Sequence, residues 1–497
     1  MARIAVIGAG MGAMAAAARL AVAGHRVTVY ERSGTYGGAL GVLERDGFAF
    51  DTGPGLVQLP AVWRDLFLKT GREPLEECVG LVPVSPASRH LFADGTAVAL
   101  PDASRAGVVS ALETALGGGA GERWGDFLSR ARDAWDRSRR PLLEEPLWSD
   151  WRVLERDPYP APRRRALLRT RQASTIAEIG AWELAEPRLA ALLSWYVLAY
   201  GLDPRHAPGG AALLPYMEQT FGTWYVEGGL RELARAVHDR CRKRRVEFVF
   251  DTEVASIEVR DGRAAGIVLA DGTAVEADHV VAGADVAAAL AGRDLWADDD
   301  VRPRGPGLPG RFTVLLALRG AAGDGVAHRS VVHSPDPAAE AAAVFGGRLA
   351  DRPTVTVLRP RDPRTRPDDG HEAVTLTATV TGPGTGPDWT DKALRERYAE
   401  VLIDTAAADP DLGGPAALRE RLLWHEVLTP AETGTVPPPA LAGPGGRWLH
   451  PSNTTRLPGL HLVGGRAHPG GGLPHAGMSG ALVAGLIVEG PGFQGSR

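Results

Sequence analysis

The hydrophobic and polar positions of the first 31 residues predict a strand, a turn, a helix and a second strand. Residues 2–7 form a short β-branched and apolar run, which is typical of a strand buried on both faces. An alanine-rich segment from residue 14 to Gly24 predicts a helix, with Gly24 as its C-cap. Residues 25–30 predict the second strand, which ends at Glu31. This order is that of a βαβ unit.

In the rest of the chain, the spacing of hydrophobic residues predicts helices in some segments and strands in others. Helices are predicted over residues 60–69, 121–140, 189–200, 228–245, 391–408 and 474–488. Strands are predicted over residues 80–84, 90–100, 246–250, 279–285, 312–318, 328–333, 354–358 and 373–380. Within the helix at 121–140, Trp124, Phe127 and Trp135 fall on one apolar stripe, so we expect them in the core.

A β-meander is predicted between residues 252 and 277. Strand-like runs at 252–260, 265–270 and 274–277 are separated by two Asp-Gly pairs, at positions 261–262 and 271–272. Asp-Gly is a favoured turn between paired antiparallel strands. The next strand, at 279–285, would return the chain to a parallel sheet.

Composition limits the partners of this protein. A chain of 497 residues exceeds one ordinary hydrophobic core, so two domains are expected. A net charge of −5, without basic blocks interleaved with aromatic residues, argues against a nucleic-acid partner. Cys78 and Cys241 are isolated, which favours a reduced, cytoplasmic protein without a structural metal site. The apolar runs at 189–200 and 476–488 are too short to span a bilayer.

One segment leaves membrane contact open. Residues 163–171 combine several arginines with Ala166, Leu167 and Leu168. A basic amphipathic helix of this kind lies on anionic membrane surfaces, which would make the protein peripheral. A solvated arginine-rich face or loop is the alternative. The sequence leaves the oligomeric state open.

The turn between the first strand and the first helix carries a glycine motif. Gly8, Gly10 and Gly12 are followed by Ala13, where a third fingerprint glycine often stands. Small residues let the backbone approach a pyrophosphate at a helix N-terminus, and an acid such as Glu31 accepts hydrogen bonds from ribose hydroxyls. The complete pattern therefore predicts a dinucleotide-binding site. A secretory signal or a glycine turn without a ligand is the alternative interpretation.

Further motifs extend this site. The segment RSGTYGG at 32–38 leads into FAFDTGP at 48–54, and WYVEGGL follows at 224–230. Near the end come LHLVGG at 460–465 and HPGGGLP at 468–474. In these motifs the chain resembles the phytoene desaturase family of FAD-dependent oxidoreductases, within the amine-oxidase-like flavoproteins.

The resemblance implies FAD as the cofactor and a set of residues around it. These residues are Gly8, Gly10, Gly12, Ala13, Glu31, Arg32, Gly38, Ala39, Gly53, Pro54, Val254, Gly464, Gly465, Gly472, Leu473 and Pro474. Val254 occupies the position at which the family's backbone contacts the adenine. The helix after Gly472 would direct its N-terminal dipole at the flavin, which stabilises the negative charge of the reduced ring.

The expected fold class is α/β, with a Rossmann-type FAD-binding domain that contains the β-meander and a discontinuous α+β substrate domain. The FAD domain is expected at 1–74, 221–290 and 441–497, and the substrate domain at 75–220 and 291–440. Residues 75–220 would supply a helical cover and residues 291–440 a sheet. A cavity enclosed between that sheet and the helical cover would suit an elongated apolar ligand.

Three residues are candidates for acid-base catalysis. His475 is the first by its position beside the proposed flavin-facing turn, and Glu218 and Tyr216 lie at the end of the helical cover. A structural role is the alternative for each, and His468 is expected to be a structural turn residue. No Ser-His-Asp, HExxH or close carboxylate pair is recognisable, but a flavin reaction depends more on substrate positioning than on a nucleophile.

The chain also departs from the family pattern. The family usually has Arg directly after the GG pair, where this chain has Ala39. It also usually has Arg before the proline that corresponds to Pro451, where this chain has His450. The family commonly has Gly after the proline that corresponds to Pro474, where this chain has His475. Fewer cations and an added imidazole change the electrostatics around the flavin. FAD binding is still expected, but these changes put carotenoid desaturation in doubt.

The resemblance implies hydride transfer between flavin N5 and a long polyene or isoprenoid-like molecule. Dehydrogenation is the usual direction, and reduction-triggered cyclisation in natural-product biosynthesis is the other. Two alternatives stay open: a flavin amine oxidase, and a prenyl-lipid carrier of the same architecture that performs no chemistry.

Overall fold

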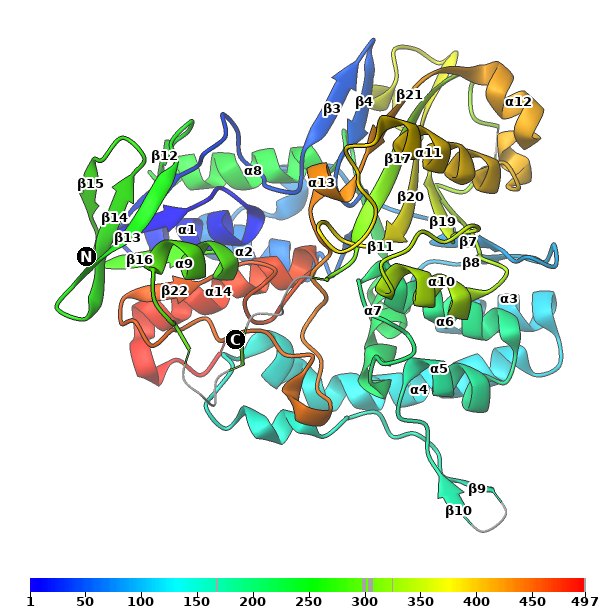
Figure 1. Ribbon diagram of the computed structural model, residues 1–497, viewed down its shortest axis with the longest axis horizontal. Helices are drawn as coiled ribbons and strands as arrows, with labels where there is room; N and C mark the ends of the chain where they lie inside the picture. The colour runs from blue at the N-terminus through cyan, green and yellow to red at the C-terminus, as the bar shows by residue number, and fades with distance from the viewer. Residues whose placement is uncertain (167–168, 297–300, 303–306, 324, 496–497) are drawn as a thin grey trace.

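The computed structural model describes residues 1–166, 169–296, 301–302, 307–323 and 325–495 (Figure 1). A parallel five-stranded sheet forms its first layer. In spatial order the strands are β12 (Glu247–Val249), β2 (Arg26–Tyr30), β1 (Arg3–Ile7), β16 (His279–Ala282) and β22 (Leu460–Leu462). The predicted βαβ unit is confirmed, and the last strand comes from the far end of the sequence.

The two faces of this sheet have different covers. Ile4 and Val6 of β1 pack toward a core that includes residues of four helices. These helices are α1 (Met11–Val22), α2 (Ala61–Gly71), α8 (Leu230–Lys243) and α14 (Leu473–Glu489). Ala5 points to the opposite face, which packs against α9 (Ala284–Ala291) and the meander. This alternation is what a strand buried on both faces produces.

The meander has the predicted form. Its antiparallel strands are β13 (Val254–Arg260), β14 (Arg263–Leu269) and β15 (Ala274–Glu276). Asp261 and Gly262, at the first predicted turn, both have positive φ angles of 51° and 76°. The Asp-Gly pair therefore adopts the left-handed conformations that a tight hairpin requires.

A seven-stranded sheet forms the second large layer. Its spatial order is β21 (Leu422–Leu428), β17 (Gly310–Arg319), β20 (His371–Val380), β19 (Val355–Leu358), β18 (Arg329–Val332), β7 (Ser88–Leu91) and β8 (Ala97–Leu100). Helix α11 (Lys392–Ala406) covers one face, where Val314 and Leu316 pack with Leu402 (Figure 1). On the other face Leu315 packs with Phe48 of the hairpin β3 (Val42–Arg45) and β4 (Phe48–Asp51).

Two features of this sheet were not predicted. Strand β21 pairs with β17 at one edge, although its sequence was not identified as a strand. Strand β7 pairs in parallel with β18, so residues far apart in the chain meet in one sheet. The hairpin β7–β8, with its Asp94-Gly95 turn, thus belongs to the sheet and not only to the helical cover.

Helices from the middle of the chain pack on one another, and the core that most of them share reaches the second sheet at Leu100 of β8 and Val331 of β18. These helices are α3 (Arg105–Leu116), α4 (Ala120–Arg139), α5 (Ile176–Ile179), α6 (Pro187–Ala199), α7 (Leu213–Phe221) and α10 (Pro337–Phe345). Trp124 and Phe127 are fully buried and Trp135 is nearly so, which confirms the predicted apolar stripe. A small sheet of β5 (Val57–Gln58), β11 (Thr223–Val226) and β6 (Leu81–Pro83) lies between the two large sheets, which mark the two halves of the molecule.

Of the two interpretations of residues 163–171, the basic amphipathic helix is wrong, whereas membrane contact stays untested. The backbone forms an antiparallel pair, β9 (Arg164–Ala166) and β10 (Arg169–Arg171), which protrudes from the helical region (Figure 1). Residues 167–168 of that prediction lie outside the described residues. In a helix, Arg165 and Arg169 would be like charges four residues apart, which destabilises the helical form.

Within the part of the chain that the structure describes, no helix combines the length and hydrophobicity needed to cross a bilayer. The division of the chain into five domain segments stays a prediction.

Candidate active site

The glycine turn after β1 lies against the N-terminus of α1. Gly8 has a φ of 92°, and Gly10 is the N-cap of α1. A Cβ atom on Gly12 would come within 2.8 Å of the Ala476 carbonyl oxygen, so only glycine permits this contact between α1 and α14. A Cβ atom on Gly10 would meet none of the described atoms within 4 Å. Open space therefore faces the unpaired N–H groups at the start of α1, as a pyrophosphate requires.

Glu31 lies beside this turn. One of its carboxylate oxygens accepts a hydrogen bond of 2.8 Å from the Ala9 backbone N–H, and the other accepts one of 2.9 Å from the Ser33 N–H. The Thr252 N–H donates to the Glu31 carbonyl oxygen at 2.9 Å, which brings Val254 and the meander close to the acid. Arg32, the next residue, is exposed. Glu31 is thus fixed beside the glycine turn, and its contact with a ribose stays a prediction.

The loops that follow pack onto the glycine turn. The Gly37 N–H donates to the Ala9 carbonyl oxygen at 2.8 Å, and a Cβ atom on Gly38 would lie 3.2 Å from the Gly10 Cα atom. A Cβ atom on Gly53, which precedes Pro54, would overlap the Ala39 carbonyl oxygen at 2.1 Å. Gly38 and Ala39 nevertheless remain exposed. The motifs predicted around FAD therefore surround one open region.

Asp51 connects two of these motifs. Its carboxylate accepts hydrogen bonds of 2.9 and 3.0 Å from the Leu230 N–H, in the first turn of α8. Gly229, with a φ of 88°, allows the close approach, because a Cβ atom there would lie 2.8 Å from a carboxylate oxygen of Asp51. Burial raises the pKa of Asp51 to about 6. The segments at 48–54 and 224–230 are joined by this contact.

The C-terminal motif completes the region. Gly464 follows β22 with a φ of 93°, and a Cβ atom on it would meet none of the described atoms within 4 Å. Its N–H donates to the Ser479 hydroxyl at 3.0 Å, and the Asn453 amide donates to that hydroxyl at 3.2 Å. Gly465 packs closely, because a Cβ atom on it would lie 3.0 Å from a ring carbon of Pro437. The open space at Gly464 is thus bordered by fixed backbone.

Gly472 precedes the first residues of α14, Leu473 and Pro474, and places His475 in the first turn. The His475 side chain is buried, and burial together with His468 lowers its pKa to about 4. Its Nδ1 atom has no hydrogen-bond partner among the described residues and would lie 3.3 Å from a Cβ atom on Gly472. Near neutral pH the imidazole is uncharged, with one nitrogen still able to bind a ligand.

His468 has the structural environment expected for it. It is fully buried, and its Nε2 atom forms a hydrogen bond of 2.9 Å with the Glu145 carbonyl oxygen.

Glu218 is held in a buried polar network. It forms a bidentate ion pair with Arg329 and accepts hydrogen bonds from the Tyr196 hydroxyl, at 3.1 Å, and from the Gln58 amide. Gln58 in turn accepts a hydrogen bond from the Tyr200 hydroxyl. Within the described residues, the hydrogen-bond and ion-pair partners of the Glu218 carboxylate are side chains. A catalytic role for Glu218 stays a prediction, and the geometry favours a positioning role.

Tyr216 lies in an aromatic group. Its ring centre is 6.3 Å from that of Trp135 and 6.4 Å from that of Phe221. The side chain remains half-buried, and its catalytic role also stays a prediction.

Sequence reasoning did not identify Tyr200 as a site residue, although it lies beside Gly472. Its ring would be 3.8 Å from a Cβ atom on Gly472, and burial raises the pKa of its hydroxyl. The only sequence signal was its place at the end of an apolar helix, which does not distinguish a core tyrosine from one in a site.

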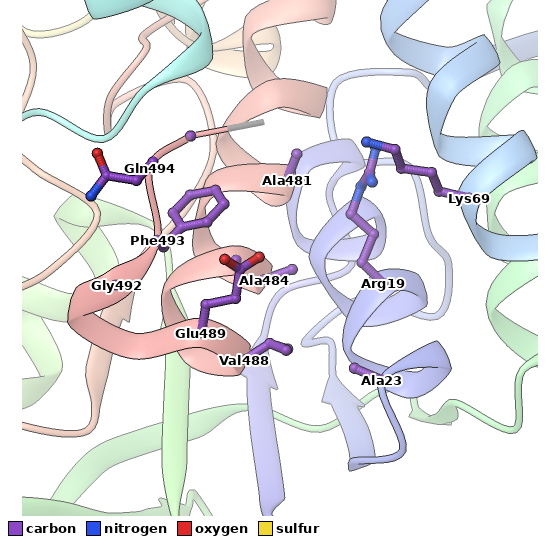
Figure 2. Close-up of a pocket in the computed structure, with 12 residues that line it drawn as sticks. Arg19, Ala23, Lys69, Ala481, Ala484, Val488, Glu489, Gly492, Phe493 and Gln494 are labelled. Carbon is purple, nitrogen blue, oxygen red and sulfur yellow. The ribbon is translucent and has the colours of Figure 1, made fainter. Parts of the chain in front are cut away.

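Of two hollows in the described part of the chain, one lies far from the glycine-lined region and the other borders it. The larger, about 460 Å³, lies between α1, α2 and the C-terminal end of α14, and Figure 2 shows Arg19, Lys69 and Phe493 around it. Because α14 has 17 residues and is therefore about 25 Å long, this hollow is far from Gly472. The smaller is lined by residues of both halves, including Asp51, Gly53, Gly228, His328, Leu358 and Thr375. It marks the junction between the cofactor region and the second sheet.

A family model described as flavin containing amine oxidoreductase matches residues 14–488. The chain belongs to this family. Hydroxyneurosporene desaturase of Cereibacter sphaeroides is 30% identical, with 98% of this chain and 97% of the relative covered. Phytoene desaturase (neurosporene-forming) of Rhodobacter capsulatus is also 30% identical, over 99% and 95%. The 4,4'-diapolycopene oxygenase of a Methylomonas species is 28% identical, over 98% of each chain.

Solved structures show the same fold. An oxidoreductase from Methanosarcina mazei has a TM-score of 0.64 at 17% identity, with 97% of this chain and 99% of the other covered. Putrescine oxidase with putrescine bound has a TM-score of 0.62 at 13% identity, over 98% and 99%. This flavin containing amine oxidoreductase is thus an FAD-dependent enzyme of phytoene desaturase-like type. The prediction of FAD as cofactor is confirmed, whereas the contact of each residue with FAD stays a prediction.

Proposed function

We propose that this protein transfers a hydride between FAD and a long, mostly apolar polyene. The curated relatives are named as desaturases or an oxygenase of carotenoids and cover nearly the whole chain. Dehydrogenation of the polyene and reduction that triggers its cyclisation are the two directions that we retain. The convergence of both chain ends on one open region, next to the second sheet, carries this proposal.

The residues around that region divide the binding of FAD between them. The N–H groups at the start of α1 would bind the pyrophosphate, and Glu31 would accept hydrogen bonds from a ribose. The backbone at Val254 would lie against the adenine, and Gly464 and Gly472 would leave space for the flavin. FAD bound there supplies a hydride acceptor or donor at its N5 atom.

The substrate would lie between the glycine-lined region and the second sheet. Thr356, Thr375, Thr377 and Thr379 of β19 and β20 are half-buried, whereas the residues between them are buried under α11. Both strands are central in the sheet, so accessible surface on this face requires open space inside the protein. We infer that this space receives the polyene, with α6 and α7 beside it.

The protein's own residues would position the substrate and control its protons. His475 is uncharged near pH 7, so it can accept a hydrogen bond at Nδ1 without bringing a fixed charge to the flavin. Glu218 would hold Arg329, Tyr196 and Gln58 in place, and Gln58 would fix the Tyr200 hydroxyl. Tyr216 is retained as a more distant candidate.

Anaerobic mixing of the FAD-loaded protein with candidate long polyenes in detergent micelles, both neutral and acidic, tests this proposal. Loss of the flavin absorbance near roughly 450 nm is expected for a dehydrogenase. For the reductive direction, protein reduced beforehand should regain that absorbance with a polyene and not with a saturated hydrocarbon such as squalane. Bleaching by amines such as putrescine, with no response to any polyene in either direction, would instead identify an amine oxidase.

A further inference from the structure

Four polar side chains lie next to one another on the inner face of the second sheet. Arg311 and Thr313 are two residues apart on β17, and both point away from the α11 side, where Phe312 and Val314 are buried. The register places Thr379 opposite Arg311 and Thr377 opposite Thr313. Figure 1 shows β17 and β20 side by side in this sheet. Directly opposed side chains are close enough to contact one ligand.

Arg311 differs from other arginines of the interior. Arg329 is paired with Glu218, and Arg359 forms a bidentate ion pair with Glu372 at 2.6 and 3.0 Å. The half-buried Arg311 guanidinium makes no hydrogen bond or ion pair with any described residue. Burial lowers its pKa, and the Tyr200 hydroxyl is the other group that acts on it. A cation that has lost water without gaining an acceptor is costly unless a ligand supplies one.

The neighbouring hydroxyls leave room for such a ligand. The Thr379 hydroxyl donates to the Leu198 carbonyl oxygen, and the Thr356 hydroxyl accepts from the Trp195 indole N–H. The hydroxyls of Thr313 and Thr377 form no hydrogen bond within the described residues. The group therefore offers a guanidinium and two hydroxyls, all of which can donate to the same oxygen atoms.

The position of this group connects it to the reaction. Tyr200 lies against Gly472 at the flavin-facing turn and interacts electrostatically with Arg311. The pyrophosphate of FAD has its own donors at the start of α1, so it does not require Arg311. A neutral hydrocarbon would leave the Arg311 cation without an acceptor.

We infer that Arg311, with the hydroxyls of Thr313 and Thr377, binds an anionic oxygen group of the substrate. The substrate is then an acidic polyene, with a carboxylate or an equally acidic enol, and not a neutral carotenoid hydrocarbon. This inference rests on the proposed function, because it specifies the substrate class of the same cavity. Guanidinium groups bind such oxygen pairs through two parallel hydrogen bonds, which also fixes the direction of the polyene.

Calorimetric titration of the FAD-loaded protein with all-trans-retinoic acid and with methyl retinoate, at pH 8 in non-ionic micelles, tests this inference. The acid and the ester share one polyene and differ in charge. We expect the wild type to bind the acid at least about tenfold more tightly, and R311M to bind both alike. R311K should retain part of the preference, and T313V/T377V should reduce it.

R319M is the matched control, because Arg319 is on the same strand and is exposed. It should retain the preference of the wild type. Equal binding of acid and ester by the wild type, or an unchanged preference in R311M, overturns the inference. A changed flavin reduction potential in R311M with the preference intact would also overturn it, because Arg311 would then act on the cofactor. Failure of the proposed function is distinct: no polyene, acid or ester, would change the flavin spectrum, whatever the calorimetry shows.

Discussion

Glu218 and Arg329 form an ion pair in the interior, with side chains that are 3% and 7% exposed. Arg329 also donates to the Ala87 carbonyl oxygen at 3.0 Å, and its guanidinium lies 5.2 Å from the centre of the Trp195 ring. The pair thus joins α7 to β18 and to the loop before β7. Most of its energetic importance lies in the cost of leaving one charge unpaired.

Replacing one partner should therefore destabilise the protein strongly. E218A leaves the Arg329 cation buried alone, and we expect it to lower the free energy of unfolding by roughly 3 to 5 kcal/mol. The double variant E218M/R329M should lose less than E218A, because no unpaired charge remains. Urea unfolding at pH 7 measures both values. If E218A is as stable as the wild type and only its turnover falls, Glu218 acts in catalysis and the positioning role is wrong.

Removal of the Glu31 carboxylate should weaken FAD retention. E31A loses the acceptor for the proposed ribose and the two hydrogen bonds to the Ala9 and Ser33 backbones. The expected cost is roughly 1 to 3 kcal/mol in FAD binding, the scale of an unpaired buried group. The ratio of flavin absorbance to protein absorbance after desalting measures it. R26A, at the exposed first residue of β2, is the control; equal occupancy in E31A and wild type would remove Glu31 from the cofactor site.

Two neighbouring glycines should respond differently to a side chain. At Gly12 a Cβ atom would meet the Ala476 carbonyl oxygen at 2.8 Å, so G12V should destabilise the apoprotein by disturbing the contact between α1 and α14. At Gly10 a Cβ atom would meet none of the described atoms within 4 Å, so G10V should leave apoprotein stability nearly unchanged and exclude FAD. Thermal unfolding without flavin and flavin occupancy separate the two effects. Full occupancy in G10V would show that the open space is not the pyrophosphate site.

Acid should destabilise the protein through its buried histidines. The pKa of His475 is lowered to about 4 by burial and by His468, whose own pKa burial also lowers to about 4. Unfolded histidine binds a proton near pH 6.5, so the unfolded state binds more protons between pH 6.5 and 4, and stability falls as pH falls through this window. The contribution of His475 is up to about 3 kcal/mol.

Urea unfolding of H475Q at a series of pH values tests this contribution. The variant should show a flatter decline below pH 6.5 than the wild type. Asp51 acts in the opposite direction, because its pKa is raised to about 6 by burial and protonation below that value favours the folded state. A decline of equal slope in H475Q and wild type would mean that His475 does not titrate as its surroundings indicate.

Local sequence signals predicted the cofactor half of the molecule well. The turn at Gly8 to Gly12 and the acid at Glu31 are fixed by short-range backbone needs, which residue types report directly. The meander was predicted for the same reason, because Asp-Gly pairs specify the hairpins by themselves.

The parts that depend on distant contacts could not be predicted. The parallel pairing of β7 with β18 has no local signal. The arginines that alternate with apolar residues along 163–171 were compatible with a helix or a loop. Neither interpretation anticipated the paired strands. Tyr200 and Arg311 come near each other through the packing of α6 and β17. Their sequence neighbours therefore do not distinguish them from ordinary core and surface residues.

The parallel pairing of β7 with β18 also affects how the chain is made. His90 contacts its partner His333 across 243 residues of sequence. During synthesis, the edge of the β7–β8 hairpin stays without its neighbour until β18, two thirds of the way along the chain, has left the ribosome. Unpaired edges of this kind associate with other chains. Slow translation at low temperature and co-produced chaperones should therefore raise the yield of folded protein from a recombinant host.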